Sequence, residues 1–476
     1  MEYDFSVPLQ SHVMGSAPPV HPGNSDMRTV LYGTDISRAG VPEETLNEKF
    51  FVAFEDASGR RFALTEEMLS KHLLILGGIG SGKTNTFNFL IESLFTRLTT
   101  DDVMVIFDTK GDFYKKFYRD HLSIFNLIGN DEQYAGITKS WNLFDELRDK
   151  NGAFTRRSEQ TAKEISKQLF QGRESESQPF FTQAAADLVS KVMIHLYRKA
   201  VKNHTDNLLE TADLVDFLKT AKHQTYYNMV NDPDNPDFVS AETYFGKPGE
   251  KLTPQALGVF GNINAMVNDL FVGVFAERSR NGSISMRELV RKKQGNILFV
   301  EYDLSVGKTL GPMYRIIYDL ALKEALGGRE HRGNVYMITD EWKLLPNLMH
   351  FDDALNFGRS MGVKLICGLQ SIRQLYDIYG EDRAKAMLSG FMNCFCFQAE
   401  DYDTRRFIVD RFGETYENLH FSHGTTPINT QRDGHTVEDW DVLELSIGQA
   451  FIKLNKHKPF LFRFRNFDEP HRVIRS

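Results

Sequence analysis

Cysteine is scarce in this sequence, and long apolar runs are missing. The 476 residues include only three cysteines, at positions 367, 394 and 396. They are too few for a disulfide framework and indicate a reducing compartment. The longest apolar stretches fall far short of the roughly 20 residues that a membrane helix needs, and the N-terminus has no apolar signal segment. These absences predict a cytoplasmic protein with no transmembrane segment in this chain.

An excess of basic residues is also missing. The chain has 56 Lys and Arg residues against 64 Asp and Glu residues, which gives a formal net charge of −8. This balance excludes a generally basic surface, although a basic channel within an acidic protein is compatible with it. Apolar residues make up 41% and charged residues 25% of the chain, as in folded globular proteins. The length predicts two or three structural units.

The hydrophobic pattern divides the chain into three parts. Residues 1–45 are rich in Pro, Gly, Ser and Asp without a sustained period, and predict an extended arm. Residues 46–154 and 262–476 alternate helical patterns with strands so apolar that both faces should be buried, which predicts an α/β fold with a mostly parallel sheet. Residues 155–261 show the i, i+3, i+4 apolar spacing of helices and predict an all-helical insertion.

A phosphate-binding loop is the clearest motif. The segment GGIGSGKT follows the apolar strand HLLIL and precedes a helical pattern, and this context is the one that the motif G-x-x-x-x-G-K-[ST] requires. Lys83 should contact the β- and γ-phosphates of a nucleoside triphosphate, and the Thr84 hydroxyl should bind Mg²⁺. The predicted nucleotide-binding residues are Gly77, Gly78, Ile79, Gly80, Ser81, Gly82, Lys83, Thr84 and Asn85.

Hydrolysis needs an acidic group from another strand. The strand NVYMIT ends in Asp340 and Glu341, at the edge of an open α/β sheet where ligands bind. We expect Asp340 to hold the Mg²⁺ with its water shell and Glu341 to polarise the attacking water. Asp108, at the end of the strand VMVIF, competes for the metal-binding role. It ranks second because its nearest following acid is Asp112, four residues away.

Two further polar residues lie near the predicted strand that follows Glu341. Gln370 ends this strand, and its neutral amide can sense water or the γ-phosphate. Arg359 precedes the same strand and can reach the nucleotide site of a neighbouring subunit. An isolated surface arginine is more often only solvated or ion-paired, so this alternative stays open.

Taken together, these segments resemble the nucleotide-binding domain of type IV secretion coupling proteins, the DNA-pumping ATPases of conjugation in the FtsK-HerA superfamily. The resemblance runs from about residue 50 to about residue 467. The segments that carry it, together with the helical insertion, are GGIGSGKT, IFDTKGDFY, WNLFDEL, ITDEW, GRSMG, GLQSIRQL and LELSIGQAFIKL.

The resemblance implies a RecA-like P-loop fold that uses ATP and Mg²⁺. It implies that Lys83, Thr84, Asp340, Glu341 and Gln370 take the family's catalytic and binding roles, and that Arg359 is an arginine finger acting on the next subunit of a ring of six. DNA, bound mainly without regard to sequence, is the implied cargo. A relaxase or another substrate protein would bind the helical insertion, and partners would hold the protein at the inner face of the membrane.

Two other functions remain open from the sequence. One is a double-strand DNA translocase of the FtsK-HerA type, working in segregation, repair or defence, which suits the missing membrane helices but not the helical insertion. The other is an ATP-gated adaptor that recruits substrate proteins through the insertion and hydrolyses ATP slowly. The complete set of Lys83, Glu341 and Gln370 favours an active motor over this adaptor.

Overall fold

A nine-stranded sheet forms the centre of the molecule. The computed structural model describes residues 28–38, 40–42, 51–119, 122–174, 178–245, 252–327, 332–423 and 426–468. The strands of the sheet lie in the order β16 (Phe460–Arg463), β15 (Gln449–Lys453), β12 (Asn393–Phe397), β4 (Leu73–Leu76), β11 (Val363–Leu369), β10 (Val335–Thr339), β5 (Val103–Thr109), β9 (Asn296–Tyr302) and β6 (Phe125–Ile128).

Seven of these strands, from β12 to β6, run parallel, while β15 and β16 continue the sheet antiparallel at one edge. Side chains alternate along each strand, so Leu74 and Leu76 of β4 join one hydrophobic cluster and Leu73 and Ile75 join the other. Both faces of the strands are therefore buried, which explains their continuous apolar runs. The predicted α/β fold with a mostly parallel sheet is confirmed.

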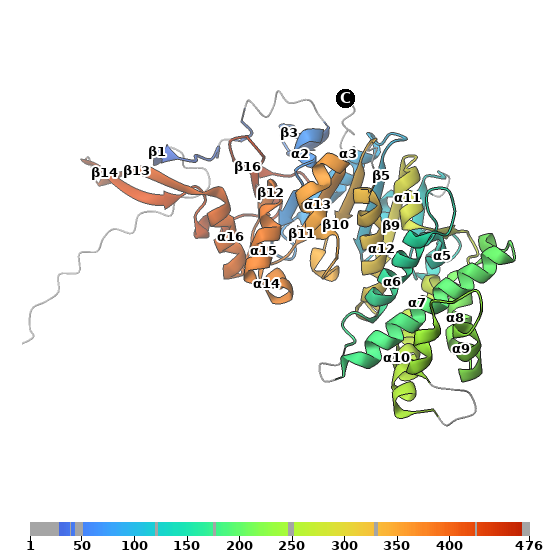
Figure 1. The fold of residues 1–476 in the computed structure, drawn as a ribbon. Helices are drawn as coiled ribbons and strands as arrows, with labels where there is room; N and C mark the ends of the chain where they lie inside the picture. The colour runs from blue at the N-terminus through green and yellow to red at the C-terminus, as the bar shows by residue number, and fades with distance from the viewer. Residues whose placement is uncertain are drawn as a thin grey trace, which may run out of the picture.

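Helices cover both faces of the sheet (Figure 1). One face packs against the hairpin of β2 (Val52–Glu55) and β3 (Arg61–Leu64), and against the helices α2 (Glu66–Leu69), α3 (Lys83–Phe95) and α4 (Asp112–Phe117). The other face packs against α12 (Gly307–Gly327), α13 (Phe351–Phe357), α14 (Arg373–Tyr379), α15 (Glu381–Ser389) and α16 (Tyr402–Phe412). The short helix α17 (Asp439–Leu443) precedes β15.

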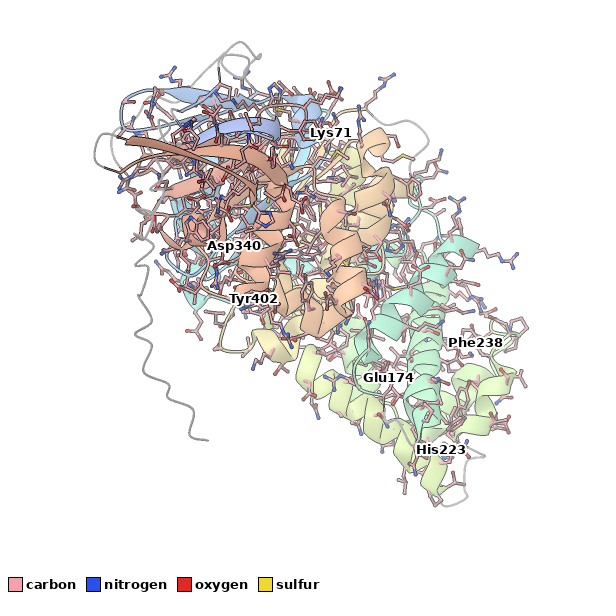
Figure 2. All side chains as sticks on the ribbon, turned by 90° about the vertical axis from the view of Figure 1, so that its left-hand side faces the viewer. Lys71, Glu174, His223, Phe238, Asp340 and Tyr402 are labelled. Carbon is pink, nitrogen blue, oxygen red and sulfur yellow. The ribbon has the colours of Figure 1, made fainter. Side chains whose placement is uncertain are left out.

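A group of helices extends from the end of the sheet that carries β6 and β9 (Figure 1). It consists of α6 (Arg156–Phe170), α7 (Pro179–Lys202), α8 (Thr211–Thr220), α9 (His223–Val230) and α10 (Pro254–Leu270). Thr253 caps α10 and Pro254 opens it, as their residue types favour. The predicted boundary at residue 261 lies inside α10, because Gly261 is tolerated in the helix, so the helical part reaches Leu270. Figure 2 shows His223 and Phe238 in this region and Asp340 in the sheet region.

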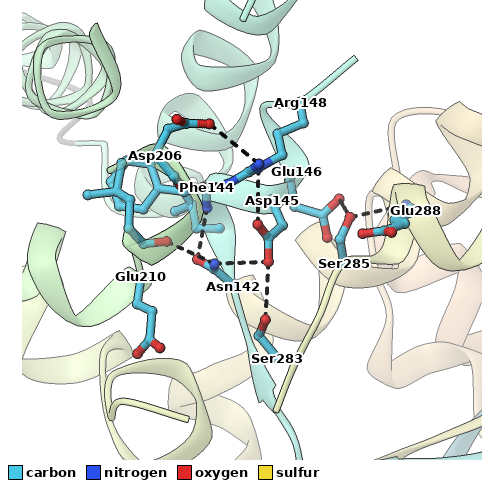
Figure 3. A network of polar contacts seen from close by, with 12 residues as sticks. Asn142, Phe144, Asp145, Glu146, Arg148, Asp206, Glu210, Ser283, Ser285 and Glu288 are labelled. Carbon is cyan, nitrogen blue, oxygen red and sulfur yellow. Dashed lines mark hydrogen bonds and ion pairs between the residues drawn. The ribbon is translucent and has the colours of Figure 1, made fainter. Parts of the chain in front are cut away.

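Short strands and a polar network hold the base of this helical part. β7 (Ser140–Trp141) pairs in parallel with β8 (Ser283–Ile284), and so brackets the insertion between them. The short helix α5 (Leu143–Glu146) follows β7, and α11 (Met286–Lys292) follows β8. Figure 3 shows Asp145 joined to Asn142, Ser283 and Arg148, and Arg148 joined in turn to Asp206 of the helical part.

A three-stranded antiparallel ribbon lies at the other end of the molecule from the helical part (Figure 1). It consists of β1 (Arg28–Gly33), β13 (Glu414–His423) and β14 (Thr426–His435). The predicted N-terminal arm thus contributes a strand, and the rest of the arm lies mostly outside the described residues. Among the helices of the described ranges, none is long and apolar enough to cross a membrane.

Candidate nucleotide site

The P-loop connects β4 to α3 at the carboxyl edge of the sheet. Gly82 has a φ of 114°, and a Cβ atom there would lie 3.0 Å from the Cα atom of Gly448, so both conformation and space require glycine. The backbone N–H of Gly78 donates a 2.7 Å hydrogen bond to the carbonyl of Gln398, which ties the loop to the end of β12. Gly82 is also the N-cap of α3, whose first N–H groups would face an anion bound in the loop.

Lys83 already lies over the loop that it is predicted to serve. Its Nζ atom donates to the carbonyl oxygens of Gly77, at 2.5 Å, and Gly78, at 2.8 Å. Burial lowers the pKa of Lys83 to about 8, whereas the carboxyl groups of Glu341 and Asp340 act in the opposite direction. Phosphate oxygens are stronger acceptors for an ammonium group than neutral carbonyls, so Lys83 is positioned to exchange these contacts for a nucleotide.

Glu341 and Gln370 meet at the ends of the neighbouring strands β10 and β11. Gln370 Nε2 donates a hydrogen bond to Glu341 Oε2. Glu341 is only 7% exposed, and burial raises its pKa. Its Oε1 atom is buried and accepts no hydrogen bond from the described residues. A carboxylate with one oxygen held by an amide and the other open suits a general base for water.

The parallel pairing of β5 and β10 also brings Asp108 close to Asp340. Burial raises the pKa of Asp340 to about 7 and that of Asp108 to about 8, and the carboxyl group of Asp340 further disfavours ionisation of Asp108. Asp108 Oδ2 accepts from the backbone N–H groups of Phe113 and Tyr114, at 3.0 and 2.8 Å, and so fixes the start of α4. These hydrogen bonds give Asp108 a structural role that does not require a metal ion.

The residues nevertheless fit a magnesium ion. The Oδ1 atoms of Asp340 and Asp108 are both buried without a hydrogen bond from the described residues, while Thr84 is an exposed residue at the same edge of the sheet. The described residues hold no group of three or more acidic, histidine or cysteine side chains that would form a full metal cage. Mg²⁺ needs no such cage, because it takes one or two carboxylates together with waters and phosphate oxygens.

The other residues of the loop differ in their surroundings. Ile79 is 89% exposed at the tip, and the Ser81 hydroxyl donates a 2.9 Å hydrogen bond to the carbonyl of Gly78. The Asn85 side chain donates to the carbonyl of Arg465, at 2.8 Å, and accepts from the backbone N–H of Phe467, at 2.7 Å. The side chain of Asn85 thus holds the C-terminal segment against α3, which leaves its backbone for a nucleotide.

A cavity of about 670 Å³ adjoins the loop at Gly82 and Asn85. Its other walls come from distant parts of the chain, namely residues 56–58, Arg60, residues 447–448 and residues 463–466. The exposed side chain of Ile447 lies at this cavity. The size and the position of the cavity suit the ribose and base of a nucleotide whose phosphates lie in the loop. Sequence reasoning missed these residues because they follow no motif and converge only in the fold.

Arg359 lies far from the nucleotide site of its own chain. It belongs to the turn η7 (Gly358–Met361) that precedes β11, at the amino edge of the parallel strands, whereas the P-loop follows the carboxyl end of β4. Its side chain is 60% exposed, and its guanidinium lies 3.7 Å from the exposed carboxylate of Glu67. This position keeps Arg359 away from a nucleotide bound to the same chain.

Two lysines near the site were also missed. Lys343 follows Glu341 by two residues, and its Nζ atom lies 3.8 Å from Glu341 Oε1. Lys110 has a left-handed backbone with a φ of 75°, and its charge acts on both Glu341 and Lys83. The segment ITDEWK could have indicated Lys343, because a positive charge two residues from the predicted base Glu341 affects the ionisation of its carboxyl group.

The fold and this cluster are those of a P-loop nucleotide-binding protein. Residues 61–471 match the family model described as the type IV secretion-system coupling protein DNA-binding domain, and the chain belongs to this family. The resemblance inferred from the motifs is therefore confirmed. The chain is 22% identical over 418 residues to the type IV secretion system-coupling protein VirD4 of Bartonella henselae, and 27% identical over 154 residues to the coupling protein TraD of Escherichia coli strain K12.

These matches cover 82% and 31% of this chain, and 62% and 21% of the two relatives. Among solved structures, the unbound conjugative coupling protein TrwBdeltaN70 superposes with a TM-score of 0.68 at 19% identity, over 95% of this chain and 97% of the other. The plasmid coupling protein TrwB in complex with ADP and Mg²⁺ gives a TM-score of 0.67 at the same identity, and covers 95% and 97% of the two chains. The likeness establishes a shared fold.

Proposed function

We propose that this protein is a ring-forming, DNA-stimulated ATPase that moves DNA, or a protein–DNA substrate, as a coupling protein of conjugation and type IV secretion. The observation that carries the proposal is the cluster of Lys83, Asp340, Glu341 and Gln370 at one edge of the sheet, in a fold of the coupling-protein family. A pure scaffold has no need of a buried base with an amide beside it.

The chemistry follows from the position of each group. The P-loop and Lys83 would hold the triphosphate, and Thr84 and Asp340 would hold Mg²⁺ through their oxygen atoms. When bound, the metal would neutralise negative charge on the phosphates. Glu341 accepts a proton from the attacking water through Oε1, and Gln370 fixes the carboxylate through Oε2.

The assembly is also part of the proposal. Arg359 would complete the nucleotide site of the next subunit, which requires a head-to-tail interface. We propose that this interface closes into a ring of six. DNA would pass through the ring with contacts to its backbone rather than its bases. The helical part, from α6 to α10, would bind a relaxase or another substrate protein, and partners would place the ring at the inner face of the membrane.

The test is the ATPase rate measured against protein concentration, with and without single- and double-stranded DNA. We expect a rate per subunit that rises cooperatively with concentration and increases with DNA, and Lys83→Ala should abolish both effects. A slow rate that is independent of concentration and DNA would refute the motor and favour an adaptor. Relaxase binding is tested by deleting α8 and α9, which should abolish capture of the relaxase and leave the ATPase rate intact.

A further inference from the structure

A second cleft, of about 580 Å³, opens at the same edge of the sheet as the P-loop. It lies where the start of α12 meets the segment after Glu341 and the ends of α6 and α10. It shares no lining residue with the cavity beside Gly82. The charged residues of its lining are Arg173, Asp269, Lys308, Arg315 and Lys343.

The charge of this cleft is opposite to that of the protein as a whole. Four basic residues and one acid give a local charge of +3, whereas the whole chain carries −8. Only Arg173 is neutralised within the cleft, because its guanidinium lies 2.9 Å from the carboxylate of Asp269. Such a local excess of positive charge attracts an anion.

Arg315 is the strongest indication of an anionic ligand. It is half-buried, and no hydrogen bond or ion pair joins it to another described residue. Burial lowers its pKa, and the more distant charges of Tyr379 and Glu174 act in the opposite direction without reversing this shift. Removing a guanidinium from water without a partner is unfavourable, and an anion in the cleft would compensate for it. Lys308 is exposed on the first turn of α12, so the positive surface continues from Arg315 to the outside of the molecule.

Lys343 connects the cleft to the catalytic base. Its side chain lines the cleft and is 32% exposed, and its Nζ atom lies 3.8 Å from Glu341 Oε1. This oxygen is the one that Gln370 leaves open for water. The ammonium group of Lys343 therefore lies beside the oxygen atom that has to accept the proton of the attacking water.

We propose that this cleft binds phosphate groups of the DNA backbone through Arg315 and Lys343, and that binding draws Lys343 away from Glu341 and thereby accelerates hydrolysis. The inference rests on the proposed function. A bound phosphodiester supplies a second, fully charged partner for Lys343, which draws the ammonium group away from Glu341 Oε1 and leaves this oxygen free to accept a hydrogen bond from the attacking water. The side chains of arginine and lysine contact the charged phosphates of DNA and not its bases, so they bind DNA of any sequence, as a translocating motor requires.

The test compares the DNA dependence of the ATPase rate in Lys343→Gln, Lys343→Arg and Arg315→Gln with that of the wild-type protein. Lys219→Gln is the matched control, because Lys219 is an exposed lysine on α8, away from the cleft. The rate is measured against the concentration of a DNA oligonucleotide at several salt concentrations. Unfolding temperatures check the fold, and Lys308→Gln replaces Arg315→Gln if the latter does not fold.

Lys343→Gln should reduce the ratio of DNA-saturated to DNA-free rate several-fold toward one, and Lys343→Arg should restore most of it. Arg315→Gln should raise the half-saturating DNA concentration roughly five- to eightfold at about 0.1 M salt, since each lost phosphate contact lowers the slope of log affinity against log salt by about 0.7 to 0.9. Lys219→Gln should behave like the wild-type protein in both respects.

Two results would overturn the inference alone. In the first, DNA stimulates the ATPase rate of the wild-type protein, and it stimulates the cleft variants equally and with the same slope of log affinity against log salt. In the second, inorganic phosphate inhibits Arg315→Gln less than it inhibits the wild-type protein, while both respond equally to DNA. The cleft would then bind the phosphate released by hydrolysis and not DNA. A wild-type enzyme that does not respond to DNA at all would overturn both this inference and the proposed function.

Discussion

Replacing Arg359 by alanine tests catalysis and assembly together. The side chain is 60% exposed and its nearest partner is the equally exposed Glu67, so the unfolding temperature should not change. ATP binding should also persist, because Arg359 lies at the opposite edge of the sheet from the P-loop of its own chain. The rate of hydrolysis should fall by roughly 10³ to 10⁵, the effect of an arginine finger that stabilises charge on the transferring phosphoryl group.

Mixing two inactive variants makes this prediction quantitative. Arg359→Ala retains the P-loop and lacks the finger, whereas Lys83→Ala retains the finger but binds the nucleotide weakly and does not hydrolyse it. In a head-to-tail ring assembled at random from equal amounts, an interface is active when its P-loop comes from the first variant and its arginine from the second. This occurs at about one interface in four, so the mixture should recover up to about a quarter of the wild-type rate.

The measurement is the steady-state ATPase rate of each variant alone and of mixtures at several ratios, with co-assembly verified by size. Arg406→Ala is the matched control, because Arg406 is 55% exposed and pairs with the exposed Asp410, as Arg359 does with Glu67. It should keep the wild-type rate. Full activity of Arg359→Ala alone, or co-assembled mixtures without any recovery, would refute the role of Arg359 in a neighbouring site.

Three other predictions concern the site and its cargo. Lys83→Ala should weaken nucleotide binding roughly ten- to hundredfold in a fluorescent-nucleotide titration. Glu341→Gln should bind the nucleotide normally and hydrolyse ATP about 10² to 10⁴ times more slowly than the wild-type protein. Hydrolysis by Glu341→Gln at the wild-type rate would refute the role of Glu341 as the base. Because the pKa of Asp108 is raised to about 8, its contribution to stability is complete below pH 4 and is lost as the pH rises toward 8. In the absence of nucleotide and metal, Asp108→Asn should therefore raise the unfolding temperature at pH 8 and not at pH 4. An equal change in unfolding temperature at the two pH values would contradict a raised pKa of Asp108. DNA binding should weaken steeply with salt and show little sequence preference, and salt-insensitive binding would refute backbone contacts.

Local patterns along the chain were enough to predict the strands and the P-loop. Both faces of β4, β5 and β10 are buried, so their apolar runs carry an unambiguous signal, and the turn to α3 needs glycine at a position such as Gly82 for conformational reasons. The end of the helical part was harder to place, because residue 261 is a glycine and a glycine within a helix resembles a boundary. The roles of the individual site residues remain predictions.

The amino-acid sequence by itself determined the nucleotide chemistry of this protein, since a P-loop and an acid-ended strand depend on neighbours in the chain. Only the tertiary structure decided which distant groups meet at that site. The order of the parallel strands places Gln370 on Glu341 and Asp108 beside Asp340, and the C-terminal segment closes a cavity against Gly82. The tertiary structure also places Lys343 between Glu341 and a basic cleft. Contacts between strands and helices far apart in sequence depend on packing and leave no periodic pattern in the sequence.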